Sequence, residues 1–440
     1  MKLVRLANWN LYPWIITHKT SFNSEEKLKE KVIHDEHFIA RGNGRSYGDA
    51  SLGSTIYNTL NYNKILKFDT DQGVIIAESG TLLSEILNVI IPSGWFLPVT
   101  PGTKYVTIGG AVAADVHGKN HHKEGCISDH IIYLDILTDD GNVYKCSRVQ
   151  HPDLFFATCG GMGLTGVILS VTLKLKKINS SFIKQTVIKA RNIFEMLDLL
   201  EENSNFTHNV SWLDCITQGK SLGKGIINLG EHVTNENSEL IPNKKPPKWN
   251  IPFYFPNITL NHFTNYLFNK AYYSKEFKRK KTSQVHYEPF FYPLDGITNW
   301  NRMYGKRGFV QYQFVIPMEA GHKGFETILK LIVKKGFGSF VSVLKILGTS
   351  NENPLSFPKT GYTLALDFAI TKNLFEFLNE LDKVVLDFNG RLYLAKDARM
   401  NRKVFEKSYP RYQEFIKTVK KYNPNGKLKS KLSERLLPEL

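Results

Sequence analysis

Two glycine-rich segments constrain the fold of this chain more than any other feature. The first covers residues 41–49 and reads Arg-Gly-Asn-Gly-Arg-Ser-Tyr-Gly-Asp. Glycine reaches positive φ at little cost and has no Cβ, so such a loop lets backbone N–H groups close around a diphosphate. The second covers residues 98–122. It holds Gly109 and Gly110 among small residues, and then a cluster of polar side chains: His117, Lys119, Asn120, His121 and His122.

The first segment differs from the fingerprint of Rossmann dinucleotide-binding domains. Gly42, Gly44 and Gly48 give the spacing G-x-G-x-x-x-G, which is one residue too long. No clear βαβ unit with an acidic residue about 20 positions further on follows it. A glycine loop alone is equally typical of an ordinary turn. The second segment, with its small residues and proton-handling groups, favours a large planar cofactor that carries a diphosphate, as a flavin dinucleotide does.

Length and composition predict a globular protein of two domains. The chain has 440 residues, its mean hydropathy is −0.26, and no run of about 18 apolar residues predicts a transmembrane helix. The N-terminus shows no signal-peptide core. Four cysteines show neither CxxC spacing nor a disulfide framework, so a reducing cytoplasm is the expected location.

The net charge of +16 calls for an anionic partner. Nucleic acid is not expected, because zinc-finger, helix-turn-helix and RNP-like patterns are absent. The charge gathers at residues 244–248, at 275–281 and from 417 onward, and the first two blocks flank an aromatic and proline-rich stretch at 249–260. Basic residues interleaved with aromatics suit an anionic membrane surface. A solvated lysine-rich loop is the alternative, and the sequence does not decide between them.

Periodicity in the first part of the chain predicts helices and strands in no regular alternation, which favours an α+β fold. Thr81 is the expected N-cap of the second helix. The expected helices are 25–36, 81–91 and 152–158. The expected strands are 37–40, 73–80, 167–175 and a hairpin of 130–138 with 142–146.

The pattern changes after about residue 177. Strands are expected at 308–316 and 391–399, the latter ending in a charged loop, and helices at 323–335 and 372–387. Residues 240–290 show no clear periodicity, so this segment is either a functional lid or partly disordered.

Several motifs resemble the vanillyl-alcohol-oxidase-type family of FAD-binding proteins. They lie at residues 41–49, 100–103, 107–110, 115–122 and 158–166. Within that family the chain is more similar to the flavoprotein half of an epimerase that acts on polyprenylphosphoryl ribose. This likeness covers nearly the whole chain, because it continues through residues 292–295, 300–305, 311–317 and 391–399.

The resemblance implies an α+β architecture with a two-part FAD-binding domain and a substrate (cap) domain on a mixed or antiparallel sheet. The FAD-binding domain is expected at 1–177. The cap domain is expected at 178–390, with a basic-aromatic insertion at about 240–290. Residues 391–440 are expected to return to the FAD-binding domain.

The resemblance also implies which residues hold FAD. Arg45 occupies the position at which many relatives carry a histidine bonded to flavin, so noncovalent FAD is expected, and no metal. The diphosphate is expected against Ala40, Arg41, Gly42, Asn43, Gly44, Arg45, Ser46, Tyr47, Gly48, Asp49 and Ala50. The flavin and its chain are expected against Gly102, Thr107, Ile108, Gly109, Gly110, Ala114, Asp115, Val116, His117, Ile168 and Tyr393.

The reaction implied by the resemblance is oxidation of a secondary hydroxyl, the 2′-OH of a lipid-linked ribose, to a ketone. Such a group donates hydride once its proton is being removed, so a base or relay must lie close. His117 and Lys396 match the family positions nearest that chemistry. The expected substrate-binding residues are Tyr47, Lys119, Tyr292, Gln311, Gln313, Lys345 and Thr363.

Two positions depart from the family pattern. Thr363 stands where the family has asparagine, and Ala365 where it has a cysteine. Because of these changes, the resemblance does not determine which sugar and which lipid the protein binds. A lactone oxidase of the arabinono- or gulonolactone type is the alternative within the fold, and a basic binding protein with a relict flavin fold is a third. The epimerase resemblance further implies an NAD(P)H-dependent short-chain ketoreductase as partner and a place at the inner face of the cell membrane.

Overall fold

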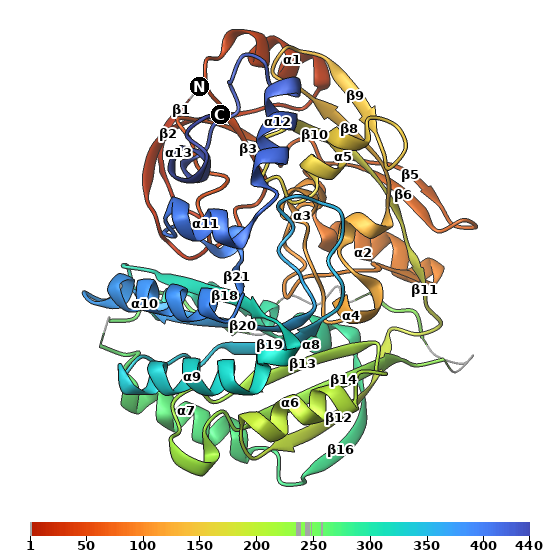
Figure 1. Cartoon of the computed structure of the whole chain (residues 1–440). Helices are drawn as coiled ribbons and strands as arrows, with labels where there is room; N and C mark the ends of the chain where they lie inside the picture. Colours follow the sequence, from red (N-terminus) through yellow and green to blue (C-terminus); the bar gives the residue numbers. More distant parts are fainter. Residues whose placement is uncertain (1, 235–238, 243–246, 248, 257) are drawn as a thin grey trace.

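The computed structural model describes residues 2–234, 239–242, 247, 249–256 and 258–440. Figure 1 shows two halves: both termini lie in the upper half, and an eight-stranded sheet with its helices fills the lower half. The predicted α+β class is confirmed. The predicted division of the chain near residues 177 and 390 stays a prediction.

Two sheets make up most of the upper half. The first has four strands in the order β1-β2-β4-β3, with β1 at Lys2–Leu6, β2 at Ile15–Ser21, β3 at Ile39–Arg41 and β4 at Thr55–Asn58. The second has the order β5-β6-β10-β8-β9, all antiparallel. Its strands are β5 at Ile65–Asp69, β6 at Val74–Glu78, β8 at Ile131–Leu137, β9 at Val143–Cys146 and β10 at Val167–Lys174.

The helices of this half are short and pack on these sheets. α3 lies within the second glycine-rich segment, and Thr107 caps it by accepting a hydrogen bond from the Gly110 N–H at 3.2 Å. The helices are α1 at Glu25–His34, α2 at Leu83–Ile90, α3 at Ile108–Ala113 and α5 at Pro152–Thr158. A further short helix, α4 at His121–Glu124, packs against the eight-stranded sheet instead.

The eight-stranded sheet is antiparallel throughout and has the order β16-β12-β14-β13-β19-β20-β18-β21. Its outer strands are β16 at Lys280–His286, β12 at Phe182–Ala190, β14 at Gly225–His232 and β13 at His208–Leu213. The strands nearer the glycine loops are β19 at Ser342–Leu347, β20 at Gly361–Ala369, β18 at Phe309–Ile316 and β21 at Arg391–Leu392. Two small two-stranded sheets pair β7 at Trp95–Phe96 with β11 at Lys176–Lys177, and β15 at Trp249–Asn250 with β17 at Ile297–Thr298.

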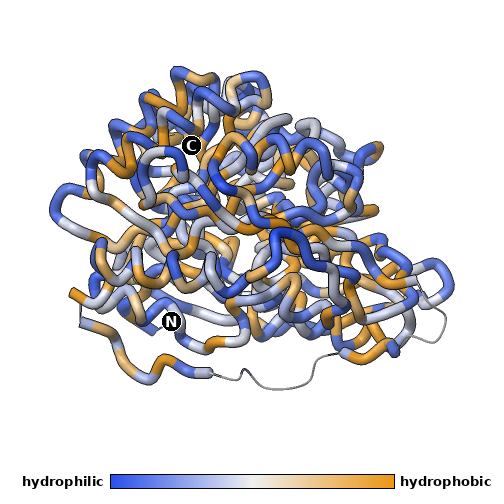
Figure 2. Tube along the Cα trace, turned by 90° about the horizontal axis from the view of Figure 1, so that it is seen from below, coloured by the Kyte–Doolittle hydropathy of each residue, from blue (hydrophilic) through white to orange (hydrophobic). Residues whose placement is uncertain are grey.

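Helices α6, α9 and α10 cover the sheet and bury an apolar stripe, because their hydrophobic residues recur at helical spacing. Figure 2 shows the molecule from below, and hydrophobic and hydrophilic residues follow one another in short steps along the chain. The helices are α6 at Ile193–Glu202, α7 at His262–Ser274, α8 at Tyr287–Phe291, α9 at Gly321–Lys334 and α10 at Leu374–Asp387.

The chain after β21 packs against the N-terminal part. The Phe38 N–H donates to the Lys427 carbonyl at 2.8 Å, and Arg435 forms an ion pair with Asp49 at 2.9 Å. Three helices lie here: α11 at Arg402–Ser408, α12 at Tyr412–Tyr422 and α13 at Lys431–Leu436. A residue of the first glycine loop is therefore held by the last helix of the chain.

Three secondary-structure predictions are wrong. Thr81 is not an N-cap: its hydroxyl faces the Lys64 carbonyl, and the helix starts at Leu83. The strand predicted over 391–399 ends at Leu392, and Lys396 lies on a 3₁₀ turn. Residues 240–290 contain α7 and β16, which the pattern missed because the apolar side chains of α7 are largely exposed. Within that insertion, residues 243–246, 248 and 257, and with them most of the basic block at 244–248, lie outside the described residues.

Candidate active site

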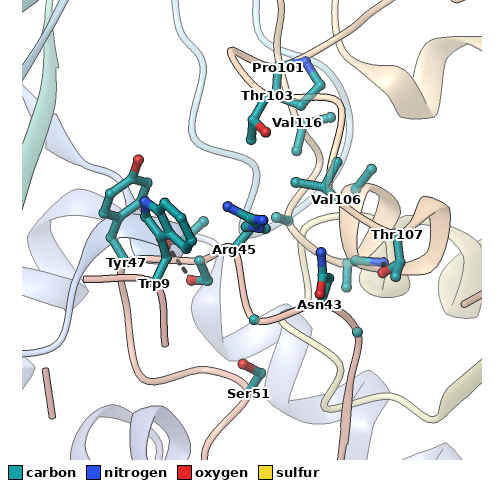
Figure 3. A pocket seen from close by; sticks show the side chains of 18 of the residues that line it. Trp9, Asn43, Arg45, Tyr47, Ser51, Pro101, Thr103, Val106, Thr107 and Val116 are labelled. Atoms are coloured by element: carbon teal, nitrogen blue, oxygen red, sulfur yellow. Dashed lines mark hydrogen bonds between the residues drawn. The ribbon is translucent and has the colours of Figure 1, made fainter. Parts of the chain in front are cut away.

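A cavity of about 330 Å³ lies between the glycine-rich segments and the eight-stranded sheet. The glycine-rich segments supply one wall, from residues 40–51 and 101–117. Another wall consists of side chains from β18, β19 and β20 and from the turn Leu394–Lys396. Trp9, Leu294, Asp295 and Trp300 line the remaining side. Figure 3 shows part of this lining, with Arg45 between Trp9 and Val106.

Packing explains the glycines of the first loop. A Cβ on Gly42 would lie 2.1 Å from Thr107 Oγ1, so the loop sits directly against the cap of α3. Gly44 has a φ of 63°, a left-handed conformation that favours glycine, and its Cβ would lie 2.1 Å from Arg41 Nη2. The Gly44 carbonyl accepts a hydrogen bond from the Trp9 N–H at 2.9 Å. The loop is therefore held in one conformation from both sides.

The first loop offers unused backbone donors. Within the described part of the chain, the N–H groups of Asn43, Gly44, Arg45 and Ser46 donate to no protein acceptor. Residues 43–46 are partly buried and line the cavity, so their free N–H groups are available to an anionic ligand. A diphosphate fits these donors, and the residues present therefore fit FAD.

His117 is buried and connects the two walls. Its Nε2 lies 3.2 Å from Gln313 Nε2, and its Nδ1 lies 3.3 Å from Lys345 Nζ. Gln313 Nε2 also donates to Thr363 Oγ1 at 3.2 Å, and Thr363 donates to the Phe314 carbonyl at 2.8 Å. With the amide in this orientation, Gln313 donates to His117 Nε2 and the ring proton resides on Nδ1. Nδ1–H can donate to Lys345 only when that amine is neutral.

Burial sets the protonation of these groups. It lowers the pKa of Lys345 to about 8. It also lowers the pKa of His117 well below 6.5, and the nearby charge of Lys345 lowers it further. The imidazole is therefore neutral at physiological pH, and Lys345 changes charge close to it.

Lys396 lies on the turn after β21, with its ammonium 4.0 Å from the centroid of the Tyr47 ring. Burial lowers its pKa to about 7, while Asp367 opposes that shift. Asp367 is itself buried, which raises its pKa to about 7, and it accepts a hydrogen bond from Gln311 at 2.6 Å. Lys396 is thus a cavity-lining amine that can gain and lose a proton near neutral pH.

The structure brings most of the predicted residues to the cavity. Of the substrate and catalytic set, it is lined by Tyr47, His117, Gln311, Gln313, Lys345 and Lys396. Of the predicted cofactor set, it is lined by Ala40, Arg41, Gly42, Asn43, Gly44, Arg45, Ser46, Ala50, Gly102, Thr107, Gly109, Gly110, Ala114, Val116, Ile168 and Tyr393. Their roles stay predictions.

Four predicted cofactor residues lie behind the lining. Asp49 pairs with Arg435, and burial raises its pKa to about 6. The Asp115 carboxylate accepts hydrogen bonds from Ser356 at 2.6 Å and from two asparagine side chains, so it anchors another loop. Ile108 is fully buried, and the Gly48 carbonyl accepts from Asn8 at 2.7 Å. These residues support the loops that form the wall.

Three predicted substrate residues are also outside the lining. Lys119 Nζ donates to the carbonyls of Phe290 and Phe291 at 2.8 and 2.7 Å, and the Tyr292 hydroxyl bonds Thr100 at 2.7 Å. Thr363 reaches the cavity through Gln313, whose amide it orients.

Other lining residues escaped the sequence analysis. Asp295 and Trp300 lie within motifs already recognised there, so their place in the pattern was a usable signal. Trp9 and Ser79 had none, because only tertiary packing brings the segment after β1 and the end of β6 to the cavity.

Comparison with known proteins agrees with this geometry. Residues 27–147 match a family model described as an FAD binding domain. Decaprenylphosphoryl-β-D-ribose oxidase of Mycolicibacterium smegmatis is 36% identical over 409 residues, which cover 90% of this chain and 88% of that protein. The chain belongs to the family of this oxidase. As a family member it is an FAD-dependent oxidoreductase, and FAD is its cofactor.

Two further relatives show how far the similarity reaches. An uncharacterised protein of Streptomyces coelicolor is 29% identical over 373 residues. The matched region covers 80% of this chain and 99% of that protein. L-gulonolactone oxidase of Bos taurus is 29% identical over only 134 residues, 30% of each chain. The lactone oxidases therefore share a limited part of the chain with this family member.

Proposed function

We propose that this protein oxidises a secondary hydroxyl of a pentose linked to a polyprenyl phosphate, namely the ribose 2′-OH to a 2′-ketone. The observation that carries the proposal is the extent of the similarity: the match to the ribose oxidase covers 90% of this chain, far more than the glycine-rich segments alone. Lys345 and Lys396 on the sheet wall suit an anionic substrate, and the amides of Gln311 and Gln313 suit a polyol.

FAD, when bound, supplies the acceptor for the hydrogen that leaves the alcohol carbon as hydride. In the proposed reaction the neutral Lys396 amine takes the hydroxyl proton, since it lines the cavity and its pKa is lowered to about 7. His117, whose two ring nitrogens contact Gln313 and Lys345, keeps these two side chains in place beside the substrate. The glycine loop would hold the diphosphate on its free N–H groups.

We propose that the FAD is noncovalent, because Arg45 and not histidine occupies the usual attachment position. A lactone oxidase is the weaker candidate, since lactone oxidases match over 30–45% of this chain, against 90% for the ribose oxidase.

We further propose contact with a membrane surface through the insertion. Among the described residues no helix is both long and apolar enough to cross a bilayer. Large apolar side chains are nevertheless exposed: Phe277 is 96% exposed, Ile258 78% and Trp249 71%. Four basic residues, 278–281, follow Phe277 directly in the sequence, as expected for a surface that meets anionic headgroups. Such a site at the inner face of the cell membrane would deliver a lipid-linked sugar to the cavity.

A keto sugar requires a second enzyme if the product is to be an epimer. We therefore propose a partner ketoreductase that uses NAD(P)H, so that the two reactions together would convert the lipid-linked ribose to arabinose for cell-envelope polysaccharide.

The test is anaerobic bleaching of the flavin absorbance with a panel of substrates. Farnesylphosphoryl ribose and farnesylphosphoryl arabinose represent the proposed class, and gulonolactone and arabinonolactone the alternative. We expect bleaching by the phosphoryl ribose and none by the lactones. Bleaching by the lactones alone would refute the proposal.

A further inference from the structure

Arg45 stands at the tip of the first glycine loop and points into the cavity (Figure 3). Its guanidinium lies 3.9 Å from the centroid of the Trp9 ring and 5.4 Å from that of Tyr105. Stacking on aromatic rings holds a guanidinium in place while leaving its N–H groups free at the edges.

These N–H groups are unused. Within the described ranges, the Arg45 side chain makes no hydrogen bond and no ion pair within 4.0 Å. Arg41, in the same loop, is the opposite case: its guanidinium already donates to Asn8 and to the Ala7 carbonyl. Arg45 thus offers a planar set of donors to whatever occupies the cavity.

One carboxylate lies near Arg45 without neutralising it. Asp295 interacts with Arg45 electrostatically, but its carboxylate accepts the Lys104 N–H at 2.9 Å. It would therefore compete with an anion bound at Arg45. Trp9 also packs in an apolar cluster with Trp300, Leu294 and Leu260, which extends from the cavity to the edge of the insertion.

We propose that Arg45 is the binding site for the phosphodiester that joins the sugar to its lipid, with Trp9 as the platform that holds it. This inference rests on the proposed function. The FAD diphosphate is the other phosphate near this loop, but the free N–H groups of residues 43–46 already provide for it. Arg45 lies on the Trp9 side, where the apolar cluster gives the first carbons of the lipid a path outward.

The experiment compares Arg45→Gln and Arg45→Lys with the parent protein on two substrates of equal chain length, farnesylphosphoryl ribose and a farnesyl riboside without phosphate. We expect Arg45→Gln to raise KM for the phosphoryl substrate about 10- to 100-fold, the range for lost hydrogen bonds to a charged group. KM for the uncharged riboside and the FAD content should stay the same, and Arg45→Lys should recover part of the loss. Asp295→Asn should lower KM for the phosphoryl substrate, since it removes the competing charge.

Arg5→Gln is the matched control, because Arg5 also stacks on a tryptophan, Trp14, at 4.8 Å, but is exposed on β1. Equal losses on both substrates would show a structural role, and loss of FAD would assign Arg45 to the diphosphate. Either result overturns the proposal.

If the parent protein is bleached by neither substrate, the proposed function fails by itself. The phosphate site is then judged by direct titration of the holoprotein with farnesyl phosphate, followed through tryptophan fluorescence. Binding that Arg45→Gln weakens and Arg5→Gln does not would support the site. Equal binding by all three proteins would refute it.

Discussion

The two walls of the cavity work by different chemistry. The first glycine loop presents backbone N–H groups and the guanidinium of Arg45, while His117, at the end of the second segment, connects this wall to the sheet wall. The sheet wall presents side chains whose charge changes near neutral pH, above all Lys345 and Lys396. A wall of backbone donors can bind a diphosphate but cannot move a proton. The comparison therefore separates holding the cofactor from reacting with the substrate.

The walls also tolerate change differently. Residues of the loop wall are constrained by backbone shape, because a Cβ at Gly42 or Gly44 would collide with Thr107 or Arg41. Residues of the sheet wall are constrained by protonation, so a substitution that keeps their size can still abolish their function. Variants should therefore lose either FAD or reactivity, and seldom both.

The largest expected effect is at the junction of the two walls, where Lys396 and His117 lie. Lys396→Ala and His117→Ala should each reduce the rate of flavin reduction by about 10²- to 10⁴-fold, because a positioned proton-transfer group contributes that much. Lys396 is the proposed proton acceptor, and His117 positions the side chains beside it. FAD content should be unchanged. Stopped-flow measurement under anaerobic conditions checks this, with Lys372→Ala, an exposed lysine, as control. Near-parental rates in both variants would place the chemistry elsewhere.

The insertion provides the next test. Replacing Lys278, Lys280 and Lys281 by glutamine should weaken binding to anionic vesicles by about 1 kcal/mol for each lysine at low salt. Arg279 is spared because it pairs with Glu195 at 2.8 Å. Vesicle sedimentation at rising salt is the measurement, and flavin reduction by a short-chain substrate should not change.

The control for the insertion removes the same charge elsewhere, at the exposed Lys372, Lys383 and Lys417. If it weakens vesicle binding equally, the effect is one of net charge. If the parent protein does not bind vesicles, the insertion is a solvated loop.

On the loop wall, Gly44→Ala should destabilise the holoprotein by about 1–3 kcal/mol, the cost of forcing a residue with a Cβ into a left-handed conformation. Thermal unfolding and FAD retention on gel filtration check it. Gly296→Ala is the control, since no atom lies within 4 Å of a Cβ at that position. Full stability of Gly44→Ala would mean that the loop can relax.

The pH dependence of the rate of flavin reduction tests the sheet wall without the loop wall. The pKa of Lys396 is lowered to about 7, so the amine is neutral above that pH and can act as base. The rate of flavin reduction should rise about tenfold per pH unit below pH 7 and level off above it, as expected for one essential base. FAD content should not follow this curve. A rate that falls as pH rises would show that the charged amine is the active form.

The last prediction is that none of the flavin is bound covalently. Acid precipitation should release all yellow colour into the supernatant, because Arg45 cannot form the histidyl bond. Colour that remains in the pellet would contradict this.

Much of this site could be predicted from the sequence, because glycines stand where the backbone approaches another group too closely for a Cβ. Gly42, Gly44 and Gly109 mark close approaches that only a residue without Cβ allows, and their places in the chain are enough to indicate the cofactor wall. Family resemblance extends this to Lys396 and His117, which do line the cavity.

Tertiary structure alone decided where individual side chains point. Lys119 has the position of a substrate ligand in the sequence pattern, yet its amine is held by two backbone carbonyls, and Asp49 is held by Arg435 near the other end of the chain. Trp9 reaches the cavity only because the N-terminal segment packs on the glycine loop. A sequence motif predicts the backbone conformation of its own residues. The direction of a side chain depends on distant segments, whose approach is set by the packing of the whole core.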